Sequence, residues 1–291
     1  MTLALSFVSE KLKAYMEMMK LRLASLVAFS GAFGYSLAVD KVNWGHLALF
    51  VLAAFAITGA ANIINQIIEK DLDKLMKRTQ SRPLPSERLG VREVAWLAML
   101  LFAGATFIFF FFFNVRACAL AILSTILYGF VYTPLKRVGP IAVFVGAFPG
   151  AFPPMIGWIA ATNQFGLEPG ILFAIQFFWQ FPHFWAIAWV LDEDYKKAGF
   201  RLLPSKGGKD INTAIQIMIY TVFLLPVGWL PYELGMTGIN SALVAMVFGT
   251  LFLAQTFHLM RKCTDKTALQ LMFGSFIYLP IVQIAFLLDK I

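Results

Sequence analysis

The 291-residue chain has little charge and almost no cysteine. Asp, Glu, Lys and Arg supply 14% of its residues, against roughly 25% in an ordinary soluble domain, whereas hydrophobic residues supply 59%. A soluble core has no room for that much apolar surface, so the composition excludes a soluble protein and indicates a membrane protein. With only Cys118, inside an apolar run, and Cys263, outside one, neither a disulfide framework nor a cysteine-based metal site is implied.

Long uncharged runs fill most of the sequence. Nine of them, 17 to 30 residues long, lie between charged residues. Each is long enough, or nearly so, to cross about 30 Å of hydrocarbon at about 1.5 Å per residue. The sequence therefore predicts an all-α membrane protein with nine transmembrane helices in one bundle, and a single domain over residues 1–291. The helices are expected near residues 23–39, 46–68, 94–113, 117–135, 140–161, 170–191, 212–232, 239–258 and 268–288.

The basic residues are distributed unevenly between the two sides of this predicted bundle. If the N-terminus is cytoplasmic, the connections on that side hold 21 of the 24 Lys and Arg, and the other side holds only Lys41, Arg116 and Lys290. This bias predicts a cytoplasmic N-terminus and an outer C-terminus. It also accounts for the net charge of +8 without a nucleic-acid partner.

The first twenty residues have neither the basic start of a signal peptide nor the Arg- and Ser-rich pattern of a transit peptide. We therefore expect a multi-pass protein of the bacterial cytoplasmic membrane. Since the polar chemistry is concentrated in the cytoplasmic connections, we expect the active site on that side.

A row of oxygen-bearing side chains follows the second apolar run. On a helix, Asn65, Glu69 and Asp73 fall at i, i+4 and i+8, on one face with only about 40° of drift. Polar groups at membrane depth are costly, so such a row predicts a functional site. Asp71 lies about 200° from Glu69 and contacts the same ligand only if the helix unwinds there.

A second polar stripe lies on the sixth predicted helix. Gln176, Gln180 and His183 share a face, and if the helix continues to residue 195, Asp194 joins that face while Asp192 points away. Two interpretations remain open: these side chains hydrogen-bond neighbouring helices as packing contacts, or they line a site. Pro182 frees backbone groups beside His183, which favours a cavity there.

The fourth predicted helix ends with two phenols and a cation in register. Tyr128, Tyr132 and Lys136 are spaced by four residues, and Arg137 follows. They form either an interfacial aromatic belt with basic residues reaching the membrane surface or a clamp for a diphosphate.

Acidic and basic groups at one membrane face suit a particular ligand. Carboxylates alone would repel an anion, but carboxylate and amide oxygens suit Mg²⁺, which binds one or two carboxylates together with phosphate oxygens and water. A diphosphate would suit both kinds of side chain, because Mg²⁺ bridges it to the carboxylates while Lys and Arg bind its phosphates directly. With an apolar bundle beside it, this predicts a lipid diphosphate as the substrate.

These segments together resemble the intramembrane aromatic prenyltransferases, and within them the heme-farnesylating branch, the heme O synthases. The first motif of that family, an Asn and two Asp at four-residue spacing, matches Asn65, Glu69 and Asp73, with Glu in place of the usual first Asp. The second motif normally has two aspartates four apart, and here only Asp194 fits, so a second metal would be held more weakly. The similarity covers roughly residues 15–285, and the branch is indicated by residues 76–79, 82–84, 132–137, 150–158, 179–185, 194–200 and 203–204.

The resemblance implies a reaction and a set of roles. Farnesyl diphosphate would bind through Mg²⁺ and ionise to an allylic cation; a vinyl group of heme B would attack that cation, and water would complete the hydroxyethylfarnesyl group of heme O. The implied metal ligands and catalytic groups are Asn65, Glu69, Asp73 and Asp194, with Lys136 at the leaving group. The implied substrate-binding residues are Asn62, Lys77, Arg78, Arg82, Tyr128, Tyr132, Arg137, Lys197 and His183, the last of them at the porphyrin or its iron.

Heme B would then be a substrate of the protein, and membrane lipid would surround it. A downstream heme-modifying or oxidase-assembly protein would receive the product.

Two other functions remain open. A prenyltransferase of the same fold acting on a quinone precursor or chlorophyllide would have the same row on its second helix. An ion-coupled transporter would also carry carboxylates, but here they gather at one face and none lies at the midplane.

Overall fold

The computed structural model describes residues 2–291. In this range the chain is helical apart from turns and one isolated antiparallel bridge between Thr237 and Lys290. The helices are α1 (Thr2–Met19), α2 (Leu21–Leu37), α3 (Trp44–Asp73), α4 (Val91–Ile108), η1 (Phe109–Phe113), α5 (Val115–Ile126), η2 (Leu127–Tyr132), α6 (Thr133–Leu135), α7 (Ile141–Thr162), α8 (Leu167–Val190), α9 (Asp192–Lys197), α10 (Ile211–Glu233), α11 (Ile239–Lys262) and α12 (Asp265–Leu288). The two η elements are π-helical turns.

Each of the nine predicted segments is helical in the structure. Among the described residues, eight helices are long and apolar enough to cross a membrane, with α4 and α5 counted together with the short elements that follow them; α2, at 17 residues, is a shorter apolar helix. The protein is therefore all-helical and multi-pass. The sequence prediction missed the N-terminal helix α1. Helix α3 continues beyond the predicted span of residues 46–68 to Asp73, as the predicted row of Asn65, Glu69 and Asp73 requires.

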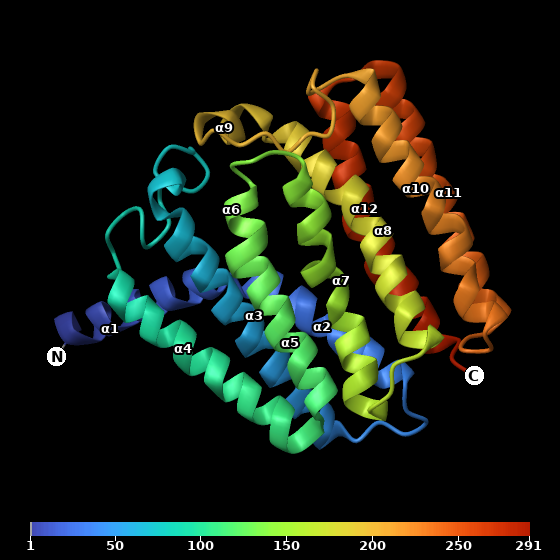
Figure 1. Ribbon diagram of the computed structural model, residues 1–291, viewed down its shortest axis with the longest axis horizontal. Helices are drawn as coiled ribbons and strands as arrows, with labels where there is room; N and C mark the ends of the chain where they lie inside the picture. Colours follow the sequence, from blue (N-terminus) through green and yellow to red (C-terminus); the bar gives the residue numbers. More distant parts are fainter. Residues whose placement is uncertain (1) are drawn as a thin grey trace.

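Successive long helices run in alternate directions (Figure 1). The connections at residues 74–90, 136–140 and 191–210 therefore meet at one end of the bundle, and the connections at residues 38–43 and 163–166 lie at the other. This alternation brings the row on α3, the end of η2 and the short helix α9 to the same end.

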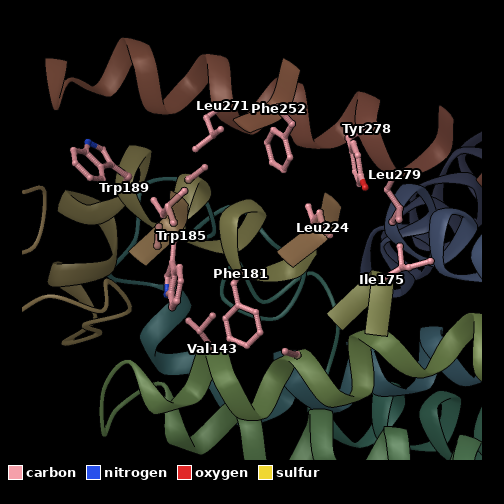
Figure 2. Close-up of a cluster of buried hydrophobic side chains, with 14 of the residues drawn as sticks. Val143, Ile175, Phe181, Trp185, Trp189, Leu224, Phe252, Leu271, Tyr278 and Leu279 are labelled. Carbon is pink, nitrogen blue, oxygen red and sulfur yellow. The ribbon is translucent and has the colours of Figure 1, made fainter. Parts of the chain in front are cut away.

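Helix α8 lies within the packed interior (Figure 2). It contacts α7, α10 and α12, and its Phe181 and Trp185 pack on Tyr220 of α10 with ring centroids 4.1 and 5.2 Å apart. The outward faces are apolar as well: Leu100 and Phe111 are 69% and 66% exposed. An apolar exterior of this kind is expected where the surrounding solvent is lipid.

The polar residues of α8 connect it to its neighbours. Gln176 Oε1 accepts a hydrogen bond from Ser30 of α2 at 2.6 Å, and its amide donates to the carbonyl of Gly150 in α7 at 2.7 Å. Gln283 of α12 donates to Ser30 Oγ at 2.8 Å, and Gln180 donates to the carbonyl of Ala147 at 3.0 Å. The packing interpretation of both glutamines is therefore confirmed.

Helices α2 and α7 cross in backbone contact because both have glycine at the crossing. A Cβ added at Gly157 would lie 1.9 Å from the carbonyl oxygen of Gly31, and one added at Gly34 would lie 2.0 Å from that of Pro154. Small residues at such crossings let helices in a membrane approach closely.

Gly157→Ala should consequently push α2 away from α7. We expect a loss of about 1–3 kcal/mol, the usual range for overpacking a well-packed site, seen as a lower midpoint of thermal unfolding in detergent. Gly104→Ala is the matched control, since Gly104 is exposed on α4 and an added Cβ there meets nothing within 4 Å. Equal midpoints for the two variants would contradict the close crossing.

Candidate active site

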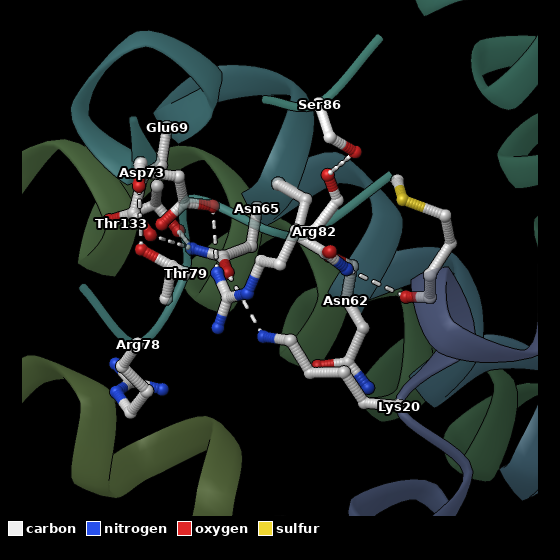
Figure 3. A network of polar contacts seen from close by, with 12 residues as sticks. Lys20, Asn62, Asn65, Glu69, Asp73, Arg78, Thr79, Arg82, Ser86 and Thr133 are labelled. Carbon is white, nitrogen blue, oxygen red and sulfur yellow. Dashed lines mark hydrogen bonds and ion pairs between the residues drawn. The ribbon is translucent and has the colours of Figure 1, made fainter. Parts of the chain in front are cut away.

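The row on α3 forms one buried face at the end of the helix (Figure 3). Asn65, Glu69 and Asp73 are 2%, 4% and 0% exposed, while Asp71, between them in sequence, is exposed. The helix continues unbroken to Asp73, so the predicted alignment is correct and Asp71 points elsewhere. Asn62, one turn earlier, is also buried, but its side chain donates to the carbonyl of Met19 and not to this row.

The orientation of Asn65 is fixed by its neighbours. Thr133 Oγ1 donates to the carbonyl of Tyr128 at 2.8 Å, so its oxygen must accept from Asn65 Nδ2 at 3.0 Å. The same amide donates to Glu69 Oε2 at 2.9 Å. Asn65 Oδ1 is thereby left as an acceptor, and Lys20 Nζ lies 3.3 Å from it.

Each carboxylate of the row faces a cation. Lys136 Nζ lies 2.8 Å from Glu69 Oε1, and Arg82 Nη1 lies 2.7 Å from Asp73 Oδ2. All four side chains are at most 20% exposed. Removing one partner from a pair this deeply buried leaves an uncompensated charge, at a typical cost of about 3–5 kcal/mol.

The segment after α3 folds back over the end of the row. Thr79 Oγ1 donates to the carbonyl of Asp73 at 2.8 Å, and both Thr79 and Met76 are buried. This turn aims the backbone N–H groups of Lys77 and Arg78 at Asp194, whose two oxygens accept from them at 2.9 and 3.2 Å.

Asp194 does not reach this position along α8, as the sequence interpretation supposed. Helix α8 ends at Val190, Leu191 leaves helical geometry, and Asp192 begins the separate helix α9. The continuous stripe from Gln176 to Asp194 is therefore wrong. Asp192 is the buried carboxylate of α9, paired with Lys196 at 2.8 Å.

Burial raises the pKa of Asp194, but the hydrogen bonds from the backbone of Lys77 and Arg78, with help from Lys197, outweigh it and hold the pKa below the ordinary value. The contact between α9 and the 74–90 connection is therefore present at neutral pH and is lost as the pH falls through that lowered pKa.

Asp194→Ala should release this connection. We expect the amide hydrogens of Lys77 and Arg78 to exchange at least about tenfold faster, since hydrogen bonds to a charged group are lost. Lys197→Ala is the control: its Nζ is 3.4 Å from Asp194 in an exposed pair, which contributes little. Unchanged exchange in Asp194→Ala would show that Asp194 does not hold the connection.

The aromatic rim is built on the wide turn η2. Tyr128 and Tyr132 have ring centroids 5.4 Å apart, and Lys136 Nζ lies 4.8 Å from the centre of the Tyr132 ring. Gly146 of α7 makes room for Tyr132, because a Cβ there would lie 2.6 Å from the ring. π-helical turns such as η2 are frequent at functional sites.

The remaining predicted residues lie at two other places. The side chains of Lys77, Arg78 and Arg137 are exposed at the end of the bundle, with Arg78 6.0 Å from the centre of the Tyr195 ring. His183 lies on the α8–α12 contact instead: its Nδ1 is 2.8 Å from Ser275 Oγ, and its ring stacks on Trp179 at 4.5 Å.

Sequence reasoning missed Lys20 and Thr133. Thr133 carries no signal beyond being polar between Tyr132 and Lys136, and Lys20 is one of several basic residues before the first apolar run. Burial, together with the positive charges of Arg82 and Lys136, lowers the pKa of Lys20 to about 7, although the carboxylates of Glu69 and Asp73 act in the opposite direction.

The donor set fits a hard divalent cation that phosphate oxygens complete. Among the described residues, no three carboxylate, His or Cys side chains form a preassembled metal site. Asp73 Oδ1 is buried and has no hydrogen-bond partner in the described part of the chain. Mg²⁺ typically takes one or two carboxylates from a protein, with phosphate and water as its other ligands. Glu69 and Asp73 supply two carboxylates here, and the amide oxygen of Asn65 is a further oxygen donor.

Comparison with known proteins defines the class. A profile of the UbiA prenyltransferase family matches residues 27–279, so the chain belongs to that family. Among solved structures, digeranylgeranylglyceryl phosphate synthase aligns with a TM-score of 0.81 at 22% identity, covering 96% of this chain and 98% of that one. A UbiA homolog from Archaeoglobus fulgidus bound to GPP and Mg²⁺ aligns with a TM-score of 0.63 at 13% identity, covering 94% and 99%. At these identities, the structures show the shared fold.

Sequence relatives narrow the class further. The protoheme IX farnesyltransferase of Cytophaga hutchinsonii is 57% identical over 284 residues, which is 97% of this chain and 99% of that protein. The protoheme IX farnesyltransferase of Flavobacterium psychrophilum is 45% identical over 285 residues, which is 95% and 94% of the two chains.

Proposed function

We propose that this protein transfers the farnesyl group of farnesyl diphosphate to a vinyl group of protoheme IX, heme B, with addition of water, to give heme O and diphosphate. The observation that carries this is the buried row of Asn65, Glu69 and Asp73 faced by Lys136 and Arg82, in a chain 57% identical to a protoheme IX farnesyltransferase over nearly its whole length.

The residues of the site suit the ionisation of an allylic diphosphate. Asn65, Glu69, Asp73 and Asp194 would hold Mg²⁺, which when bound neutralises charge on the diphosphate. Lys136 and Arg82 are already desolvated, so they can exchange their carboxylate partners for phosphate oxygens with little reorganisation. Exposed Lys77, Arg78, Arg137 and Lys197 add positive charge at the entrance.

In the reaction, the bond between C1 of the farnesyl group and the diphosphate oxygen breaks, and the electron pair leaves with diphosphate. The vinyl group of heme attacks the allylic cation and forms a carbon–carbon bond. Water adds to the resulting cation and loses a proton, which gives the hydroxyethylfarnesyl group. Tyr128 and Tyr132 lie beside Lys136, and their electron-rich rings would stabilise an allylic cation formed next to it.

The proposed assay combines the purified protein in detergent with heme B, farnesyl diphosphate and Mg²⁺, and detects heme O by mass. Removing divalent cations with a chelator should abolish product, and Mg²⁺ should restore it. Prenylation of a quinone precursor or chlorophyllide, with heme left unmodified, would contradict the heme assignment.

His183 is the proposed contact with the porphyrin or its iron. Ser275 Oγ donates to the carbonyl of Met272 at 2.6 Å, so the short contact with His183 requires Nδ1–H to donate to Ser275. In the neutral ring, Nε2 then carries the lone pair, and an anchored Nδ1–H is the usual arrangement of a metal-binding histidine.

His183→Ala should therefore raise the KM for heme B about tenfold or more and change the absorption spectrum of bound heme, while the KM for farnesyl diphosphate stays the same. His258→Ala, at an exposed position of α11, is the control. A variant with normal heme affinity and spectrum but a lower unfolding temperature would show that His183 only packs α8 against α12.

We also propose that α2 together with the eight longer helices makes nine spans, and that the end carrying the site faces the cytoplasm. The N-terminus would then be cytoplasmic, the C-terminus outside, and the membrane the bacterial inner membrane. The support is the gathering of 21 of 24 Lys and Arg at that end. In intact cells, an impermeant thiol reagent should label the variant Gln164→Cys but not the variant Lys206→Cys. The reverse labelling pattern would invert the proposed topology.

A further inference from the structure

The chain bends sharply between α1 and α2, and Lys20 is the residue at the bend. Its backbone is left-handed, with φ 51° and ψ 61°. Residues with a Cβ rarely adopt this conformation, and glycine is the usual residue there. A lysine in it persists only where the surroundings fix the backbone.

Helix α3 supplies those surroundings. Gln66 Nε2 donates to the carbonyl of Met18 at 2.7 Å, and Asn62 Nδ2 donates to the carbonyl of Met19 at 3.1 Å. Both side chains are 1% exposed. The last carbonyls of α1, which have no partner within their own helix, are thus satisfied from the helix that carries the row, and the bend is fixed relative to Asn65 and Glu69.

The result is a third cation at the row (Figure 3). Lys20 Nζ points at Asn65 Oδ1, Lys136 at Glu69 and Arg82 at Asp73, so each member of the row has one basic partner. When Lys20 is protonated, three cations lie beside two carboxylates, and one positive charge of the cluster is not balanced. An anion of the phosphate type would balance it.

We propose that Lys20 is a phosphate-binding residue of the donor site, held by the α1–α2 bend so that its amine contacts the diphosphate of the prenyl donor. This rests on the proposed function, because the donor is the diphosphate named there. A purely structural role explains the residue poorly: the backbone conformation favours glycine, and the hydrogen bond to Asn65 is long at 3.3 Å.

Lys20 also lines a surface hollow of about 480 Å³ at the bend. The hollow is lined by Lys13, Met16, Glu17, Lys20, Leu21, Arg22 and Leu23. Lys13 is exposed and has no place in the row, so it offers a matched change of the same residue type on the same surface.

Three variants at Lys20 separate its amine from its backbone. Lys20→Gly suits the left-handed bend but removes the amine, Lys20→Met removes only the charged end, and Lys20→Arg keeps a cation. We expect the first two to raise the KM for farnesyl diphosphate and the Kd for inorganic pyrophosphate about 10- to 100-fold, the worth of a hydrogen bond to a charged group. Lys20→Arg should recover most of this affinity, and the KM for heme B should stay unchanged.

Pyrophosphate binding, measured calorimetrically in the presence of Mg²⁺ and without heme, tests Lys20 apart from the transfer reaction. Lys13→Met should bind pyrophosphate as the unmodified protein does. If Lys20→Gly also binds with unchanged Kd, Lys20 merely forms the bend and the inference fails. If the unmodified protein binds pyrophosphate but prenylates no heme, the proposed function fails and the role of Lys20 as a phosphate-binding residue stands.

Discussion

Asp73→Asn is expected to lower the rate of farnesyl transfer about 100- to 1000-fold, the loss that follows when a preorganised charged group is removed from the reacting centre. The Asp73 side chain is 1% exposed, with Oδ2 held by Arg82 and Oδ1 without a hydrogen-bond partner in the described structure. The substitution keeps the shape of the side chain but removes the charge that a divalent cation would bind. The measurement is kcat for heme O formation at saturating Mg²⁺.

Asp71→Asn is the matched control, with the same change of charge two residues away on the same helix. Asp71 is exposed and lies on another face of α3, so its variant should keep normal kcat. Because Asp73→Asn leaves Arg82 without a carboxylate, thermal unfolding of both variants should be compared. Normal turnover in Asp73→Asn, or an equal loss in both variants, would remove Asp73 from the site.

Lys136→Met is expected to lower kcat about 100-fold, as loss of one donor at a developing anion commonly does. Lys136 is 11% exposed at the side chain, contacts both the Glu69 carboxylate and the Tyr132 ring, and is one of the cations proposed to bind the leaving diphosphate. Lys206→Met, at an exposed position of the same end of the bundle, should behave normally.

The variant also leaves Glu69 buried without its cation, so part of its effect is structural. The double variant Lys136→Met/Glu69→Gln separates the two effects, because neighbours in one network have non-additive free energies. We expect the double variant to recover thermal stability but not kcat. Recovery of kcat as well would mean that Lys136 only neutralises Glu69.

The helices and the row on α3 were predictable because they depend on local order in the chain. Uncharged runs of bilayer length predict helices, and four-residue spacing predicts that Asn65, Glu69 and Asp73 share a face. The exposure of Asp71 follows from the same geometry. Family motifs added the remaining polar segments, including residues 132–137 and 194–200.

The predicted helix at residues 170–191 ends within one residue of α8, but its conditional continuation to residue 195 is wrong. The break at Leu191 separates Asp194 from α8, and its side chain accepts hydrogen bonds from the backbone of Lys77 and Arg78. The backbone N–H of Leu191 still donates to carbonyls of α8, while the side chain of Asp194 is held by a segment more than 100 residues away in the sequence. Helix α1 was missed as well, since its sequence is too polar to form an apolar run.

The sequence by itself determined that this is a helical membrane protein with acidic and basic chemistry at one end, because apolar length and local spacing are properties of the chain alone. Only the tertiary structure decided which cation meets which oxygen. Lys136 reaches Glu69, Arg82 reaches Asp73 and Lys20 reaches Asn65 across 67, 9 and 45 residues of sequence. These pairings arise from the turn after α3, the wide turn η2 and the left-handed bend at Lys20, and each is fixed by packing against another helix.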